Sequence, residues 1–159
     1  MDERNIDQAI EAFGTLVYRI ARSRMATADD AEEVFQEVFI TYARKQPVFT
    51  DDTRARAWFA RTTLYHSRKL WRTIGRHMTE SLDSVAESEA APVSSADDPI
   101  LIDLHNALAQ LSEKYRKPLE LFYYGGLSTD EIAAILKIRP NTVRARMTRG
   151  RQMLKELLE

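Results

Sequence analysis

Hydrophobic side chains recur at helical spacing along most of the chain, and no alternation typical of a β-strand is sustained. The clearest stripe follows the spacing i, i+3, i+4, i+7, i+8 and i+11, and it consists of Ala31, Val34, Phe35, Val38, Phe39 and Tyr42. This spacing predicts an amphipathic helix with one buried face. Asp29 or Asp30 is placed to cap the start of that helix, which should end before Pro47.

A second helix is expected over residues 54–76, with apolar and basic side chains on opposite arcs. The apolar arc contains Phe59, Ala60, Thr63, Leu64, Ser67, Leu70, Trp71 and Ile74. The basic arc contains Arg54, Arg61, Arg68, Lys69, Arg72 and Arg76, with Trp58 and Tyr65 among them. Cations that hold a phosphate backbone, beside rings that stack on unpaired bases, are typical of single-strand binding. The alternative is that Trp58 packs against a neighbouring helix while the arginines are merely solvated.

A helix-turn-helix is predicted near the C-terminus. Ser128 and Glu131 form a capping-box pattern at the start of a short helix, and Pro140 suits the first position of the next helix. The buried stripe of that next helix would consist of Val143, Met147, Gly150 and Leu154. Its outward face would carry Asn141, Arg144, Ala145, Thr148, Arg149 and Arg151. Small side chains beside arginines suit a DNA major groove. An amphipathic terminal helix with exposed arginines, the alternative, would leave the close pairing of two capped helices unexplained.

Charge divides the chain into blocks. Residues 51–78 carry seven basic and two acidic side chains, and residues 137–159 carry the same numbers. Two basic blocks suggest two places that meet a polyanion. Residues 78–98, rich in Ser, Ala, Asp and Glu, carry six acidic side chains and no basic one, which predicts a flexible linker. The expected fold is all-α, with two small helical domains (1–77 and 99–159) joined by this flexible acidic linker.

Several classes of function are excluded by composition. The absence of cysteine rules out disulfides, Cys-ligated zinc and a thiol nucleophile. His66, His77 and His105 lack the spacing of zinc ligands, and we expect each to be a surface residue. No Gly-rich phosphate loop or nucleophile–base pair is readable, so no enzyme, cofactor or metal is expected. No apolar run approaches the ~18 residues of a membrane span, and no signal peptide is evident, which favours the cytoplasm.

The order of these features resembles the extracytoplasmic-function (ECF) sigma factors of the sigma-70 family, subunits of bacterial RNA polymerase. The segment DAEEVFQEVF, residues 30–39, is similar to the core motif of sigma region 2. The pair Trp58-Phe59 and the basic helix after it resemble the segment that melts and reads the −10 promoter element. Residues 107–158 look like region 4, which reads the −35 element. The resemblance covers both helical units.

The resemblance also implies partners and contact residues. Contacts to the clamp of core RNA polymerase would come from Asp30, Glu33, Gln36, Glu37 and Phe39. Contacts to −10 promoter DNA would come from Trp58, Arg61, Tyr65, Arg68, Lys69 and Arg72. Contacts to −35 DNA would come from Arg139, Asn141, Thr142, Arg144, Ala145, Arg146, Thr148, Arg149 and Arg151. The remaining expected partner is an anti-sigma factor. The expected location is the cytoplasm, and a membrane-bound anti-sigma factor would hold the chain at the membrane.

Five positions depart from the family pattern. Tyr65 replaces a common Asn and Lys69 a common acidic residue, which leaves the −10 sequence open. Lys137 replaces a turn glycine and Arg139 a Ser or Thr cap, so the turn should be strained or differently capped. Pro118 lies inside an expected helix and should kink it or shift its start. The alternative function is a free-standing helix-turn-helix regulator, which would need a dimer interface and would not bind core polymerase.

Overall fold

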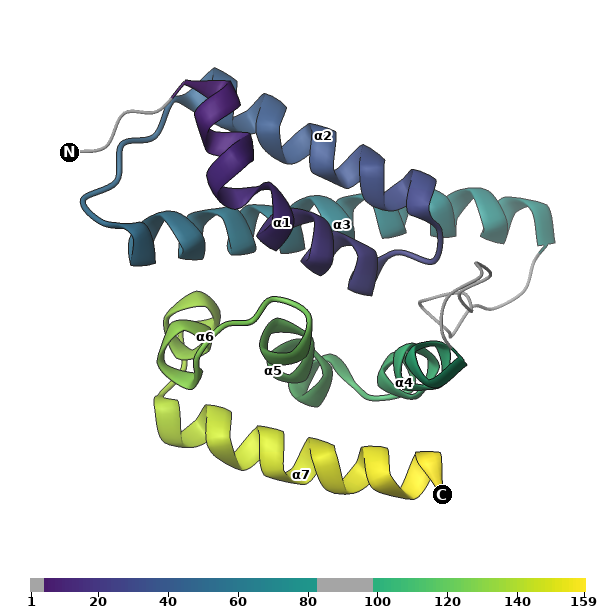
Figure 1. Ribbon diagram of the computed structural model, residues 1–159. Coiled ribbons are helices and arrows are strands. Elements are labelled where there is room, and N and C mark those ends of the chain that lie inside the picture. The colour runs from purple at the N-terminus through teal and green to yellow at the C-terminus, as the bar shows by residue number, and fades with distance from the viewer. Residues whose placement is uncertain (1–4, 83–98) are drawn as a thin grey trace.

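The computed structural model describes residues 5–82 and 99–159, with side chains described over 5–75 and 103–159. The helices are α1 (Ile6–Arg24), α2 (Ala28–Lys45), α3 (Asp52–Leu82), α4 (Pro99–Ala109), α5 (Glu113–Tyr123), α6 (Thr129–Leu136) and α7 (Pro140–Leu158). Over the described ranges the chain has no strand, and the expected all-α fold is confirmed. Helices α1–α3 form one unit and α4–α7 a second (Figure 1).

The first unit has an aromatic core. Its centre is Phe59 of α3, which is fully buried and stacks on Phe13 of α1 with 4.7 Å between ring centroids. Phe39 and Tyr42 of α2 contact the same ring at 5.3 and 5.4 Å. The apolar stripe expected on α2 is therefore confirmed, with Phe35 half-buried at its edge.

The ends of the first helices are fixed by local hydrogen bonds. Asn5 and Gln8 form a capping box at the start of α1. Thr27 is the N-cap of α2 and accepts a hydrogen bond from the amide of Asp30, so the expectation of an Asp29 or Asp30 cap was wrong. The helix ends at Lys45, before Pro47 as predicted, and its C-cap Gln46 has a left-handed backbone with φ 46°.

The second unit contains the predicted helix-turn-helix, α6 and α7. Ser128 caps α6 in the expected capping box with Glu131, and Pro140 begins α7. The buried stripe of α7 packs on α5, where a Cβ at Gly150 would lie 2.7 Å from Leu119 Cδ1. Pro118 lies inside α5. The helix begins at Glu113, five residues earlier, so Pro118 does not mark its start.

Helix α3 continues to Leu82, five residues into the segment expected to be linker. The rest of that segment, residues 83–98, lies outside the described residues. The domain boundaries themselves stay a prediction. Between the two units, α6 contacts α3 and α5 contacts α1, whereas α7 lies on the side of its unit away from α1–α3 (Figure 1).

Two histidines contradict the expectation that they lie on the surface. His66 is buried, and its Nε2 lies 2.9 Å from the Thr41 hydroxyl. Burial lowers the pKa of His66, and the nearby Lys69 acts in the same direction against the opposing charge of Glu37. His105 is buried in the second unit. The side chain of His77 lies outside those described.

Candidate functional site

The outward face of α7 has the composition that a DNA groove requires. Its exposed side chains are the predicted Asn141, Arg144, Ala145, Thr148, Arg149 and Arg151, while Thr142 and Arg146 are half-buried at the edges of the face. The turn before the helix is strained at Lys137, which adopts φ 58° and ψ 47°, the left-handed region that favours glycine. Arg139 is the N-cap and makes no side-chain cap, so it is free to face a ligand as an exposed cation.

Two arginines of α7 are held in place by neighbouring side chains. Arg144 Nη1 donates to Asn141 Oδ1 at 2.7 Å, one turn back on the same helix. Arg151 Nε donates to the hydroxyl of Tyr123 at 3.0 Å. Its guanidinium lies over the rings of Phe122 and Tyr123, 5.4 and 5.8 Å from their centroids. These contacts restrict the rotamers of both arginines at the edges of the outward face.

The basic arc of α3 is exposed along much of its length. Tyr65 is 60% exposed, and Arg68, Lys69 and Arg72 are exposed beside it. Trp58 instead packs edge-on against Phe59 and Tyr42 and contacts Phe49. The structure thus favours packing for the Trp58 ring, which is half-buried, whereas Tyr65 has the accessible ring that stacking on a base requires.

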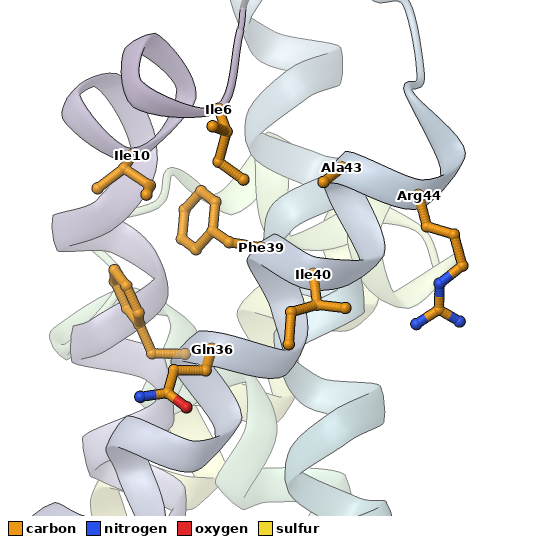
Figure 2. Close-up of a pocket in the computed structure, with 8 residues that line it drawn as sticks. Ile6, Ile10, Gln36, Phe39, Ile40, Ala43 and Arg44 are labelled. Carbon is orange, nitrogen blue, oxygen red and sulfur yellow. The ribbon is translucent and has the colours of Figure 1, made fainter.

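Helix α2 presents an acidic face beside a shallow apolar groove. Glu33, Gln36 and Glu37 are exposed, and Asp30 is half-buried at the start of the face. Phe39, expected at the surface that contacts polymerase, is only 4% exposed and lies at the floor of the groove. The groove runs between α1 and α2 and is lined by Ile6, Ile10, Phe35, Gln36, Phe39, Ile40, Ala43 and Arg44 (Figure 2).

The groove includes residues that the sequence analysis missed. Ile6, Ile10 and Ile40 are more than one third exposed, which is unusual for large apolar side chains that lie next to one another. Ile6 and Ile10 are four residues apart on α1, and Ile40 is four residues after Gln36 on α2. Apolar residues outside the buried stripes were the available signal, but the sequence does not show that α1 and α2 bring them together.

The predicted residues occupy three separate surfaces, one on each of α2, α3 and α7. Among the described residues, no group of His, Asp and Glu side chains is arranged to hold a metal ion. None of the described helices is long and apolar enough to cross a membrane.

Two family models match the chain. Sigma-70 region 2 matches residues 9–77, which contain α2 and the basic part of α3, and Sigma-70 region 4 matches residues 101–154, which contain the helix-turn-helix. Each matched segment therefore lies within one of the two helical units.

Relatives and solved structures agree with these matches. SigE, an ECF RNA polymerase sigma factor of Mycolicibacterium smegmatis, is 32% identical over 157 residues, which are 96% of this chain and 61% of SigE. The ECF sigma factor SigL of Mycobacterium tuberculosis is 33% identical over 144 residues, covering 86% of this chain and 79% of SigL. The sigma factor RpoE of Bartonella quintana, in complex with the anti-sigma factor NepR, superimposes with a TM-score of 0.75 at 26% identity over 96% of this chain and 95% of RpoE. The chain belongs to the ECF RNA polymerase sigma factors of the sigma-70 family.

Proposed function

We propose that this sigma factor directs promoter recognition by dividing three tasks among three helices. Helix α2 and the adjoining groove hold core RNA polymerase, the basic arc of α3 contacts the opened −10 element, and α7 enters the major groove at the −35 element. The observation that carries the proposal is the exposed face of α7, where small and basic side chains lie opposite a fully packed stripe.

The −35 contacts follow from positions on α7. Ala145 and Thr148 allow close approach to base edges, and Arg149 beside them can reach guanine O6 and N7 with two hydrogen bonds. Arg144 and Arg151 lie toward an edge of the face, where a helix in the groove passes the phosphates. Base readout is therefore assigned to the middle of the face and positioning to its edge.

The polymerase contact is assigned to the acidic face of α2 and the groove beside it. Exposed isoleucines provide an apolar centre, and Glu33 and Glu37 provide a negative rim. Such a surface fits a partner helix that carries apolar residues flanked by basic ones. The clamp of the polymerase is the partner that the family resemblance implies.

Run-off transcription tests the proposal directly. Core polymerase with this chain should produce discrete transcripts from genomic fragments that core polymerase alone does not produce. Glu33→Lys should abolish core retention in a pull-down, whereas Glu32→Lys, the same charge change on a different face of α2, should retain it. A chain that binds promoter DNA yet never binds core polymerase would instead be a free-standing helix-turn-helix regulator.

An anti-sigma factor and the cellular location complete the proposal. The RpoE structure contains a bound anti-sigma factor, and the family resemblance implies a partner of that kind here. We place the chain in the cytoplasm because its proposed partners, polymerase and promoter DNA, are there. Purification of the tagged chain from its host under uninduced conditions should recover a small partner protein, and recovery of polymerase alone would contradict this.

A further inference from the structure

The groove between α1 and α2 leaves apolar side chains uncovered in the single chain. Ile6 and Ile10 of α1 are each 37% exposed, and Ile40 of α2 is 48% exposed. Figure 2 shows the three isoleucines around the ring of Phe39, which lies between the two helices. Large apolar side chains that gather at the surface mark a place where another molecule binds. The charges beside the groove indicate which molecule fits.

Opposite charges lie at the two ends of the α2 side of the groove. Glu33 precedes Gln36 and Ile40 on α2, Arg44 follows them, and all four side chains are exposed. Arg44 follows Glu33 by 11 residues, which is about three helical turns, or about 16 Å along the axis. At about 100° for each residue, the two side chains are about 20° apart around the helix. They therefore lie on one edge of α2, with Gln36 and Ile40 between them along the axis.

This order of charges makes the edge complementary to a second copy of itself. When two copies pack with antiparallel α2 helices, a twofold axis beside α2 relates them. With that axis midway between Glu33 and Arg44, each Glu33 lies opposite Arg44 of the other copy, at the same height and on the same edge. Two identical ion pairs then enclose the contact. An edge with charges of one sign would repel its own copy, so opposite signs at equal distances from one point are the feature that selects a second copy.

Apolar side chains occupy the centre of the same contact. Ile40 lies within about half a turn of the axis along α2, so the Ile40 side chains of the two copies lie near each other. Ile6 and Ile10 lie across the groove from Ile40 and would be covered by the approaching helix (Figure 2). An apolar centre with a charged rim is the arrangement that protein–protein interfaces share. The groove and its charges thus form one self-complementary surface.

We propose that the groove between α1 and α2, with Glu33 and Arg44, is a self-association surface on which two copies of the chain dock with antiparallel α2 helices. Two ion pairs around one groove belong to the smaller class of interfaces, below about 1,200 Å² in total, so the dimer should form at high concentration and dissociate on dilution. The pairing does not depend on the proposed function. Its consequence rests on the proposed function, because a docked copy covers the surface assigned to core polymerase.

Sedimentation velocity of the full chain, from about 5 to about 500 μM, tests the pairing. The wild type should pass from monomer to dimer over this range. Glu33→Arg and Arg44→Glu each place like charges opposite each other at both ends of the contact, so each variant should dimerise at least about tenfold more weakly. Both positions are exposed, so the helices should be retained, which far-UV circular dichroism checks.

An equimolar mixture of the two variants is the decisive sample. The basic group introduced at position 33 of one chain lies opposite the acidic group introduced at position 44 of the other, and the native Arg44 and Glu33 form the second pair. The mixture should therefore dimerise within about threefold of the wild type, although neither variant does so alone. A mixture of folded chains that stays monomeric would overturn the antiparallel pairing.

Glu32→Arg is the matched control. It makes the same charge change one residue away, but Glu32 is 12 residues from Arg44 and about 120° from it around α2. Glu32 therefore lies on another edge of the helix, and its variant should dimerise within about twofold of the wild type. Equal weakening by Glu32→Arg and Glu33→Arg would mean that net charge alone is responsible and would contradict the pairing.

Core polymerase separates the pairing from the proposed function. Excess core polymerase added to the dimer should yield complexes that contain one copy of the chain, since both partners use the groove. If the chain dimerises as described and polymerase does not bind, the pairing stands and the proposed function fails. If polymerase binds and the wild type stays monomeric at every concentration, the proposed function stands and the inference fails. Polymerase bound to the intact dimer would overturn the shared use of the groove.

Discussion

The core of the first unit and the contact between the two units are built from opposite kinds of side chain. Around Phe59 the contacts are aromatic, and its ring centroid lies 4.7 to 5.4 Å from those of Phe13, Phe39 and Tyr42. Around Arg24 the contacts are ionic, with carboxylates from another part of the chain at 2.6 Å. Both places are buried, so burial alone does not distinguish them.

The difference lies in what happens to each group in water. An aromatic side chain that leaves its core loses the whole benefit of burial, about 25 cal/mol for each Å² of apolar surface. An ion pair that opens recovers the hydration of both charges, so its net free energy is small even when its contacts are short. An apolar core therefore suits a permanent fold, and a buried ionic interface suits two units that separate and rejoin.

The largest effect is expected from Phe59→Ala. Removal of a fully buried ring should lower the free energy of unfolding of the first unit by about 3–5 kcal/mol. Urea denaturation followed by circular dichroism measures the change. Tyr65→Ala, on the same helix but 60% exposed, should change it by no more than about 0.5 kcal/mol. An equal decrease in the free energy of unfolding for the two variants would contradict the assignment of Phe59 to the core and of Tyr65 to the surface.

A different result is expected when the ion pair between Arg24 and Glu120 is removed. Glu120→Gln should leave the unfolding of α1–α3 within about 0.5 kcal/mol of the wild type, because Arg24 becomes hydrated when the units separate. Hydrogen exchange should become faster at the end of α1 and along α5 only. A loss of about 3–5 kcal/mol would show that Arg24 stays buried without its partner and that the interface is as permanent as the core.

Acid should open the interface before it unfolds the helices. Burial alone would raise the pKa of Glu113, but the hydrogen bond and charge of Arg24, with Arg116 and Lys117 nearby, hold it below the ordinary 4.5. Burial likewise opposes the backbone hydrogen bond from Ser128 and the contact with Arg56, which together lower the pKa of Glu131. The chain with its two units in contact therefore binds fewer protons than the chain with the units separated. Its stabilisation is complete above pH 4.5 and is lost as the pH falls toward the lowered values.

Tryptophan fluorescence can follow this opening. The chain has two tryptophans, of which Trp58 packs in the first unit and Trp71 lies in the interface. In a Trp58→Phe background, Trp71 emission should shift to the red below pH 4.5 while far-UV circular dichroism is still unchanged. A shift that coincides with the loss of helix would mean that the interface and the cores come apart together.

The smallest effect is expected at an exposed hydrogen bond of an arginine on α7. Tyr123 binds Arg151 at the edge of α7 without burying it. Tyr123→Phe removes that hydrogen bond and should weaken holoenzyme binding to a promoter fragment by about twofold, since Arg151 loses part of its fixed geometry. Arg151→Ala should lower the log–log salt slope by about 0.9, as expected for one phosphate contact. In the Arg151→Ala background, Tyr123→Phe should have no further effect, and an unchanged loss there would show that Tyr123 acts independently of Arg151.

The elements of the fold could be predicted because each depends on short-range sequence signals. The stripe on α2 and the capping box of Ser128 with Glu131 involve residues within three or four positions of one another, and helix geometry alone relates them. The cap of α2 was mispredicted because Thr27 and two neighbouring aspartates all suit that position, and only the backbone geometry selects one.

The interface could not be predicted in the same way. Arg24 lies about ninety residues from Glu113 and Glu120, and no periodicity links them. A charged side chain is expected to be solvated unless its partner is known, and the partner is known only from the packing of the units. The same reason explains His66 and His105, whose burial depends on neighbouring helices. The exposure of the candidate DNA-contacting residues on α7 could be predicted from the sequence, because outward positions follow from the buried stripe.

Gly150 lies where α7, the second helix of the helix-turn-helix, packs closely against α5. The backbone of α7 approaches α5 so closely there that a methyl group would lie 2.7 Å from Leu119 Cδ1, so either the buried Leu119 side chain or the helix would have to shift. A larger residue at 150 that moved the helix would change the angle at which Ala145, Thr148 and Arg149 face the groove in the proposed −35 contact. If α7 reads the −35 element as proposed, a buried residue with no side chain helps to set the angle of the reading helix.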